Sequence, residues 1–277
     1  TGALLSAKPY VHVTWARGID ARGRPIETEQ ADYRGAGRWI SPGVFGGHNW
    51  HPMSFHPGTG LVYLPTQEMP AFYKLAPHFA PEKNAMNTGL DYSTFVHGSA
   101  ALGGKVEIRG ALVAWDPVAQ REVWRVDQPT AWNGGTLATA GNLVFQGTAT
   151  GRFVAYRATD GAKLWEAPTG TGVMAGPVSY EVDGVQYVAV AAGWGSGFAN
   201  SAGPAALAAG VRGAGRVLVY ALGGRAAPPP APPPLGPVPE PPVRSQASAA
   251  ERERGGLLYA PLSLACHGPF APWTTSN

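Results

Sequence analysis

The chain has 277 residues, of which 38 are Gly and 27 are Pro, so about a quarter of it fits poorly inside long helices. Hydrophobic residues make up 44% and charged residues only 14%, which disfavours coiled coils, four-helix bundles and charge-rich disordered proteins. The formal net charge of +3 is scattered along the chain, and apolar runs are short. We therefore expect no nucleic-acid partner and no transmembrane helix.

Short apolar segments separated by turn residues run through residues 1–224 and predict strands. In chain order these segments are 60–64, 112–116, 123–124, 142–145, 153–157, 164–165, 186–190 and 216–220. Four-stranded units that recur about every 40 residues are typical of a β-propeller. The sequence therefore predicts an all-β fold, with a propeller as the first choice.

A sequence repeat supports the propeller over the alternative of a β-sandwich. The stretches 111–124 and 152–165 align without a gap, and each is expected to form a strand, a tight turn and a second strand. An Asp-Gly pair marks the turn of the second copy. Each copy ends on a Trp, Trp124 and Trp165, and these are 41 positions apart. A sandwich would not explain Trp at matching positions.

Composition changes sharply after residue 224. Residues 225–248 hold ten Pro between Pro228 and Pro242, a run that favours polyproline II and acts as a semi-rigid spacer. Residues 249–277 begin with a sequence that favours a helix and then stop. A spacer implies that something folded lies on each side of it. Because the first residue is not Met, we expect the chain to be a fragment or to have lost a signal peptide.

Several motifs resemble those of the eight-bladed quinoprotein alcohol dehydrogenases. The repeated Ala-x-Asp-x₃-Gly-x₃-Trp pattern is similar to their tryptophan-docking motif, in which a Trp from each blade wedges between blades. Each copy departs once, with Gln120 in place of the Gly and Arg157 in place of the Asp. Residues 46–55 resemble the family segment that brings an Asn to the quinone. Residues 131–141 and 193–195 resemble further segments of the same family, and the three occur in the family's order. The resemblance implies that residues 1–224 are the C-terminal blades of such a propeller.

The resemblance implies that Asn49, Trp50 and Trp132 contact pyrroloquinoline quinone (PQQ) and that Trp194 shapes the alcohol pocket. A flat tricarboxylic acid needs stacking surfaces and a rim of hydrogen-bond donors, which an Asn amide and an indole N–H can supply. Two simpler alternatives stay open: Asn49 could cap a turn, and a Trp in a Trp-rich propeller is usually structural. The structural role is the one we expect for Trp124.

Trp165, at the second docking position, is also expected to be structural. Three His residues precede or follow Asn49 closely, and their spacing fits no standard zinc pattern. We therefore expect no metal ligation by His48, His51 or His56.

The C-terminal segment carries a second resemblance. Residues 263–268 are similar to the Cys-x-x-Cys-His motif that attaches haem in cytochromes c, with Cys266 as a thioether position and His267 as the iron ligand. Ser263 occupies the first Cys position, so at most one thioether can form. After a Pro-rich linker this motif implies that residues 249–277 are the truncated start of a cytochrome c domain.

Together the resemblances imply a periplasmic, PQQ-dependent quinohaemoprotein alcohol dehydrogenase. Such an enzyme passes a hydride from a small alcohol to PQQ with the help of Ca²⁺, and electrons continue to haem c or to a soluble acceptor. The general base and the Ca²⁺ ligands are expected upstream of Thr1, so no catalytic residue is assigned and the isolated chain is expected to be inactive. Two alternatives are a non-catalytic propeller scaffold and a haem-free, methanol-type quinoprotein dehydrogenase.

Overall fold

The computed structural model describes residues 2–81, 83, 87–91, 108–194, 209–210, 215–226 and 247–259. Across these residues the chain is almost entirely β-structure, arranged in five antiparallel sheets. The helical elements among the described residues are a short 3₁₀ turn, η1 (Glu29–Ala31), and one α-helix, α3 (Ala249–Tyr259). Within the described part, neither has the length and apolar character needed to cross a membrane.

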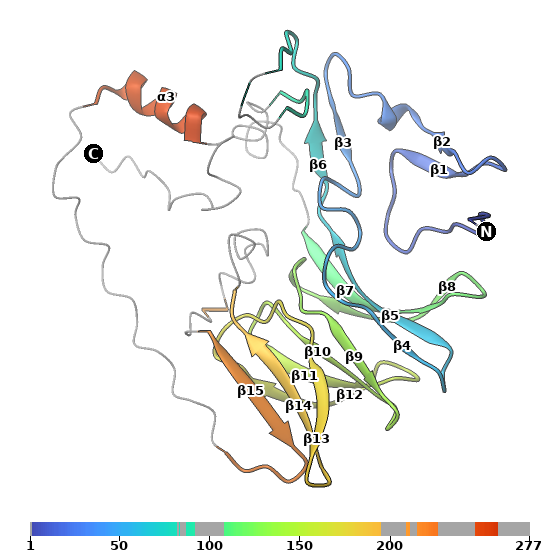
Figure 1. Ribbon diagram of the computed structural model, residues 1–277. Coiled ribbons are helices and arrows are strands. Elements are labelled where there is room, and N and C mark those ends of the chain that lie inside the picture. The colour runs from blue at the N-terminus through green and yellow to red at the C-terminus, as the bar shows by residue number, and fades with distance from the viewer. Residues whose placement is uncertain are drawn as a thin grey trace.

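Two four-stranded sheets form the centre of the molecule (Figure 1). The first has the order β4-β5-β7-β8, with β4 (Ser54–His56), β5 (Leu61–Glu68), β7 (Arg109–Asp116) and β8 (Arg121–Gln128). The second has the order β9-β10-β11-β12, with β9 (Thr136–Thr139), β10 (Leu143–Gly147), β11 (Arg152–Arg157) and β12 (Lys163–Pro168). Both are antiparallel, as expected for propeller blades, and in the first sheet the chain leaves between β5 and β7 to form β6 (Ala71–Tyr73) of another sheet.

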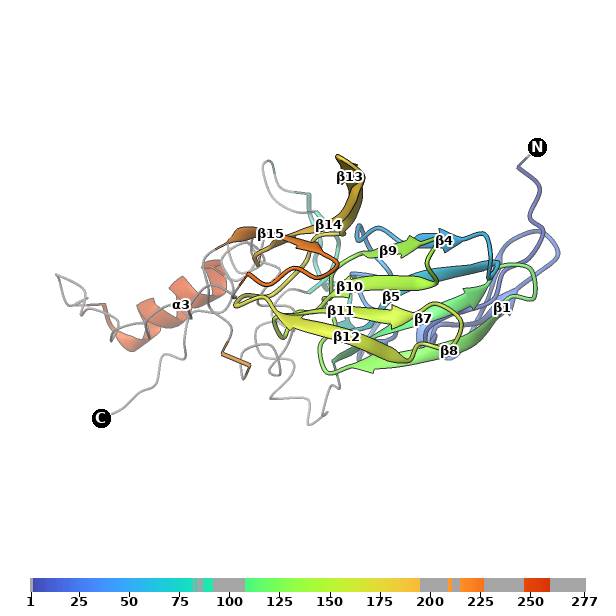
Figure 2. The same cartoon turned by 90° about the horizontal axis from the view of Figure 1, so that it is seen from below.

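Three further sheets flank this pair. A three-stranded sheet consists of β13 (Val178–Val182), β14 (Val185–Ala192) and β15 (Arg216–Ala221), and it lies beside the β9–β12 sheet in both views (Figures 1 and 2). The two smaller sheets pair β1 (Ala16–Ile19) with β2 (Pro25–Glu27), and β3 (Arg38–Ile40) with β6 (Ala71–Tyr73). The strands predicted from the sequence are confirmed, as is the repeated four-stranded unit.

The two blades are joined by a tryptophan at their interface. Trp124 of β8 donates a hydrogen bond from Nε1 to the carbonyl oxygen of Ala158 in the next blade, at 3.0 Å. Its indole lies so close to Gly161 that a Cβ there would be 2.7 Å from Cε3. Tyr63 of β5 donates its hydroxyl to the same carbonyl at 2.9 Å. These residues belong to one core that spans both blades and includes Leu61, Leu112, Ala114, Val144, Val154 and Tyr156. The structural role predicted for Trp124 is thereby confirmed.

The two copies of the repeat differ in how they use their matching positions. Trp165 of β12 is 41% exposed and meets Tyr220 of β15 edge-on, with ring centroids 5.2 Å apart. It therefore contacts the following sheet, as Trp124 does, but from a more open position. At the turn, Gln120 has φ +55° and Gly161 has φ +74°. Both turns need the left-handed conformation, which explains why Gly suits this position.

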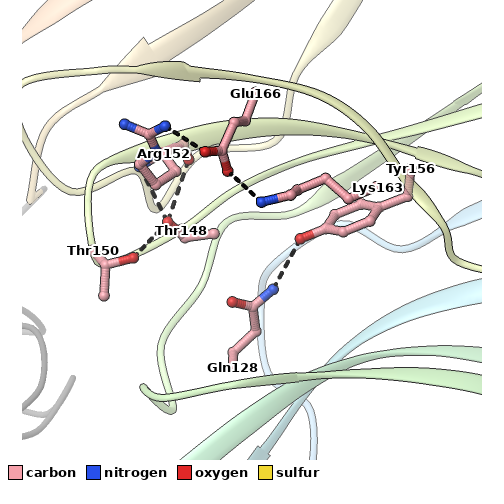
Figure 3. A network of polar contacts seen from close by, with 7 residues as sticks. All are labelled: Gln128, Thr148, Thr150, Arg152, Tyr156, Lys163 and Glu166. Carbon is pink, nitrogen blue, oxygen red and sulfur yellow. Dashed lines mark hydrogen bonds and ion pairs between the residues drawn. The ribbon is translucent and has the colours of Figure 1, made fainter.

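Polar contacts also cross between the two blades (Figure 3). Gln128 of β8 donates from Nε2 to the hydroxyl of Tyr156 on β11, at 3.2 Å. Nearby, Glu166 accepts hydrogen bonds from Lys163 at 3.0 Å and from Arg152 at 2.5 Å. The hydrogen bond from Lys163, followed by that from Arg152, lowers the pKa of the Glu166 carboxyl. This ion-pair cluster lies on the solvent-facing side of β11 and β12, where ion pairs add little stability.

The helix predicted to start near residue 249 is confirmed as α3. Its start has the pattern of a capping box. The backbone N–H of Glu251 bonds the hydroxyl of Ser248 at 3.3 Å, and the Glu251 carboxylate accepts from the backbone N–H of Ser248 at 2.8 Å. Residues 227–246 of the predicted linker, and Ser263, Cys266 and His267, lie outside the described residues.

Candidate functional site

Asn49 lies on an exposed turn that leads into β4. Its Nδ2 donates to the carbonyl oxygen of Phe45 at 2.9 Å, and its Oδ1 accepts from the backbone N–H of Trp50 at 2.9 Å. Asn49 therefore does cap a turn, which was the simpler alternative. An Asn amide has two donor hydrogens and two acceptor lone pairs. The capping bonds use one of each, so the side chain is fixed in orientation while it keeps capacity for a ligand.

Trp50 presents a large aromatic surface next to Asn49. Its side chain is 51% exposed. One part of the ring stacks on His51, with centroids 4.1 Å apart and planes inclined by 23°. An exposed indole that is held from below in this way is suited to stack against a flat ligand.

Trp132 lies underneath this surface and is fully buried. Phe45 meets its ring edge-on at a centroid distance of 5.3 Å, and His51 lies 5.0 Å from it. Trp132 also shares an apolar cluster with Trp194. The other members of that cluster are Ala131, Ala149, Met174, Phe45, Met69 and Ile108. Trp194 itself lies against Gly172, where a Cβ would be 2.9 Å from indole carbons.

The structure therefore gathers the four predicted residues of the propeller, with Phe45 and His51 as the connecting rings. These two were not predicted as site residues from the sequence. Phe45 directly precedes the motif of residues 46–55 and His51 lies within it. This position next to Asn49 was the sequence feature that could have indicated a role at the site.

Buried polar contacts hold the loop that carries Trp132. The Asn133 side chain donates to the carbonyl oxygen of Thr130 at 2.8 Å and accepts from the hydroxyl of Thr130 at 3.0 Å. It also accepts from the backbone N–H of Ala149 at 3.2 Å, which ties the loop to the end of the β10–β11 hairpin. Buried side chains that make several hydrogen bonds, as Asn133 does, fix a single loop conformation.

The two glycines after Asn133 permit close approaches between segments. A Cβ on Gly135 would be 2.4 Å from Pro52, and a Cβ on Gly134 would be 2.7 Å from the carbonyl oxygen of Ala175. Only residues without a side chain fit at such distances. The segment of residues 46–55 is thereby packed directly against the loop of residues 131–141, so the two motifs form one site.

The three His residues near Asn49 have separate environments. Nδ1 of His48 is 2.9 Å from the carbonyl oxygen of Pro65. Nδ1 of His56 accepts a hydrogen bond from the backbone N–H of Thr59 at 3.2 Å. Burial, with a smaller contribution from His48, lowers the pKa of His51 to about 4. Across the described residues, no group of three or more His, Cys, Asp or Glu side chains could hold a metal ion.

This donor set fits one class of ligand. It consists of the exposed indole of Trp50, the oriented amide of Asn49 with one N–H available, and the buried apolar side chains around Trp132. Those features suit a flat aromatic acid, and the cluster contributes no carboxylate that would bind Ca²⁺. The residues of this cluster therefore fit part of a PQQ site.

Fold and motifs together define a β-propeller of the quinoprotein class. Residues 110–188, which run from β7 into β14, match the PQQ family described as the glucose/ethanol/alcohol dehydrogenase β-propeller domain. The chain is similar to quinohaemoprotein alcohol dehydrogenases over most of its own length.

Three similarities extend over most of the chain. It is 46% identical over 98% of its length to the quinohemoprotein alcohol dehydrogenase ADH-IIG of Pseudomonas putida, and 47% identical over 81% to that of Comamonas testosteroni. The crystal structure of ADHIIG from Pseudomonas putida superposes with a TM-score of 0.83 at 43% identity, and covers 96% of this chain. The chain spans 39% of the length of the Pseudomonas putida relative and 32% of that of the Comamonas testosteroni relative. It spans 40% of the chain in the superposed ADHIIG structure.

Proposed function

We propose that the chain forms the C-terminal blades of an eight-bladed propeller in a periplasmic, PQQ-dependent alcohol dehydrogenase. In this proposal residues 1–224 belong to the propeller, residues 225–248 are a linker and residues 249–277 begin a cytochrome c domain. The observation that carries the proposal is the packing of residues 46–55 against residues 131–141 around one aromatic cluster. That packing gives a ligand a flat surface and a directed amide at the same place.

The chain's own residues have distinct tasks at this site. Asn49 donates its spare N–H to a quinone or carboxylate oxygen, and its two capping bonds prevent the amide from turning away. Trp50 offers its half-exposed ring for stacking. Trp132 supports that surface from below, and Trp194, a member of the same apolar cluster, is the residue that we assign to the alcohol pocket. Bound PQQ supplies the hydride acceptor in the oxidation of the alcohol to an aldehyde.

The remaining groups of the reaction belong to other parts of the protein. We assign the general base and the Ca²⁺ ligands to residues upstream of Thr1. Electrons pass from the quinone to haem c, for which Cys266 is the attachment position and His267 the iron ligand, or to a soluble acceptor. Haem attachment and quinone loading both require the periplasm, which is the reason for that location.

Two alternatives remain distinct from this proposal. A non-catalytic propeller scaffold would keep Trp124 and Gly161 at the blade interface but would have no use for a capped Asn beside an exposed indole. A haem-free, methanol-type dehydrogenase would keep the quinone site and would have no use for the Pro-rich linker and the Cys-His pair.

Quinone binding tests the proposal directly. The full chain is titrated with PQQ while tryptophan fluorescence is followed, and saturable quenching is expected. Asn49→Ala removes one hydrogen bond to a charged ligand and should weaken binding by about tenfold. Asn142→Gly is the matched control, because Asn142 occupies a left-handed turn position at φ +60° on another loop.

The outcomes of this titration distinguish the proposed function from its alternatives. If the unaltered chain shows no saturable quenching, the quinone site that we assign to these residues is wrong. If Asn49→Ala binds as tightly as the unaltered chain, the assignment of Asn49 is wrong. Reduction of a dye by the chain with ethanol and PQQ would contradict the placement of the general base upstream of Thr1.

A further inference from the structure

His51 lies between the two tryptophans of the site. Its imidazole stacks on Trp50 at 4.1 Å with planes 23° apart, and it faces Trp132 at 5.0 Å with planes 51° apart. Trp132 in turn meets Phe45 edge-on at 5.3 Å. These four rings, which we call the aromatic quartet, run from an exposed indole to the fully buried one.

The imidazole at this position is neutral and acts as a flat ring. His51 is 3% exposed, and its Nε2 is buried without a hydrogen-bond partner in the described part of the chain. Burial lowers its pKa to about 4, because a charged imidazole would lose its hydration there. At neutral pH the ring therefore serves neither as a cation nor as a surface base.

The aromatic quartet is connected to the amide that we assign to the quinone. The carbonyl oxygen of Phe45 accepts from Asn49 Nδ2 at 2.9 Å and from Gln67 Nε2 at 2.7 Å. The backbone N–H of Trp50 bonds Asn49 Oδ1 at 2.9 Å. Both residues that fix the Asn49 amide thus have rings in the quartet, and His51 lies between the Trp50 ring and the Trp132–Phe45 pair.

We propose that His51 is a positioning residue for the quinone site, which holds the exposed ring of Trp50 and, through it, the amide of Asn49 in the orientation that binds the cofactor. The inference rests on the proposed function and assigns His51 a role of its own. Without the imidazole, Trp50 would lose its stacking contact with His51 and its ring would be less well ordered, so PQQ binding would have to restore that order.

Three variants of the full chain test this role. His51→Ala removes the ring, and His51→Phe keeps a flat ring while it removes both nitrogens. His56→Ala is the matched control, because His56 is also buried, at 9% exposure, with an Nε2 that has no partner in the described part of the chain. His56 lies at the end of β4, away from the quartet contacts. PQQ affinity is measured by fluorescence quenching, and near-ultraviolet circular dichroism reports on the coupled rings.

The expected result is a loss of about tenfold in PQQ affinity for His51→Ala. His51→Phe should restore most of the affinity, and His56→Ala should leave it unchanged. The aromatic circular dichroism should fall in His51→Ala and persist in His51→Phe, with or without quinone.

Other outcomes overturn the inference in recognisable ways. Equal losses in His51→Ala and His56→Ala would show a general effect of stability. A His51→Phe variant as weak as His51→Ala would show that a nitrogen, and not the ring, matters. Unchanged affinity in His51→Ala refutes the role of His51 alone, whereas a chain that binds no PQQ refutes both this role and the proposed function.

Discussion

The contact between Trp124 and Gly161 should account for a measurable part of the stability of the blade interface. In Gly161→Ala, the new Cβ would lie 2.7 Å from Cε3 of the indole, a distance that real Cβ atoms do not adopt. The indole is held by its bond to the carbonyl oxygen of Ala158 and is 9% exposed, so it has little room to move. Overpacking of this kind costs about 2 kcal/mol. The left-handed φ of +74° adds about 1 kcal/mol.

Gly60 provides a control for the backbone contribution. It has a φ of +69°, but a Cβ there would meet nothing within 4 Å. Gly60→Ala should therefore cost about 1 kcal/mol in the free energy of unfolding, against about 3 kcal/mol for Gly161→Ala. The difference isolates the contact with Trp124.

Urea unfolding followed by tryptophan fluorescence measures both variants under one condition. We expect the midpoint for Gly161→Ala to fall well below that for Gly60→Ala, with an unchanged slope. Equal midpoints for the two variants would refute the reasoning, because the indole would then have moved away at no cost.

Two further predictions concern buried polar groups. Tyr63→Phe removes the hydroxyl donor to Ala158, whose carbonyl keeps its bond to Trp124, so unfolding free energy should fall by about 1 kcal/mol in the same urea assay. A larger loss than for Gly161→Ala would contradict this ranking. The second concerns pH: His51 takes up a proton near pH 4 when folded, but near 6.5 when unfolded, so the unfolded chain binds more protons between these values. The contribution of the neutral His51 ring to the free energy of unfolding should therefore be fully present above pH 6.5. The free energy of unfolding should fall by up to about 3 kcal/mol as the pH drops to 4. His51→Phe should abolish this decline, and an unchanged decline would show that other groups cause it.

Local sequence pattern was sufficient to predict the strands. Alternating and apolar segments such as 112–116 and 153–157 form β7 and β11 because each strand needs only a buried face and turn residues at its ends. The repeat also placed Trp124 correctly, since docking depends on a fixed spacing along one hairpin. The helix start near residue 249 followed from the local capping chemistry of Ser248 and Glu251.

Tertiary contacts decided the details of the site. Residue order alone did not indicate that His51 would lie between two indoles, or that Trp165 would be more exposed than Trp124. The approach of Gly135 to Pro52 joins segments about 80 positions apart, as does the hydrogen bond between Ser54 and Thr136. Strand periodicity carries no information about which distant segment will lie opposite.

Residue pattern along the chain was therefore enough to identify the strands, the blade repeat and the motifs that resemble those of quinoprotein alcohol dehydrogenases. The tertiary structure decided which rings meet, which imidazole is buried and neutral, and how the amide of Asn49 is oriented. The physical reason is that burial and ring packing depend on all the neighbours of a side chain, and most neighbours in a propeller come from other strands and other blades.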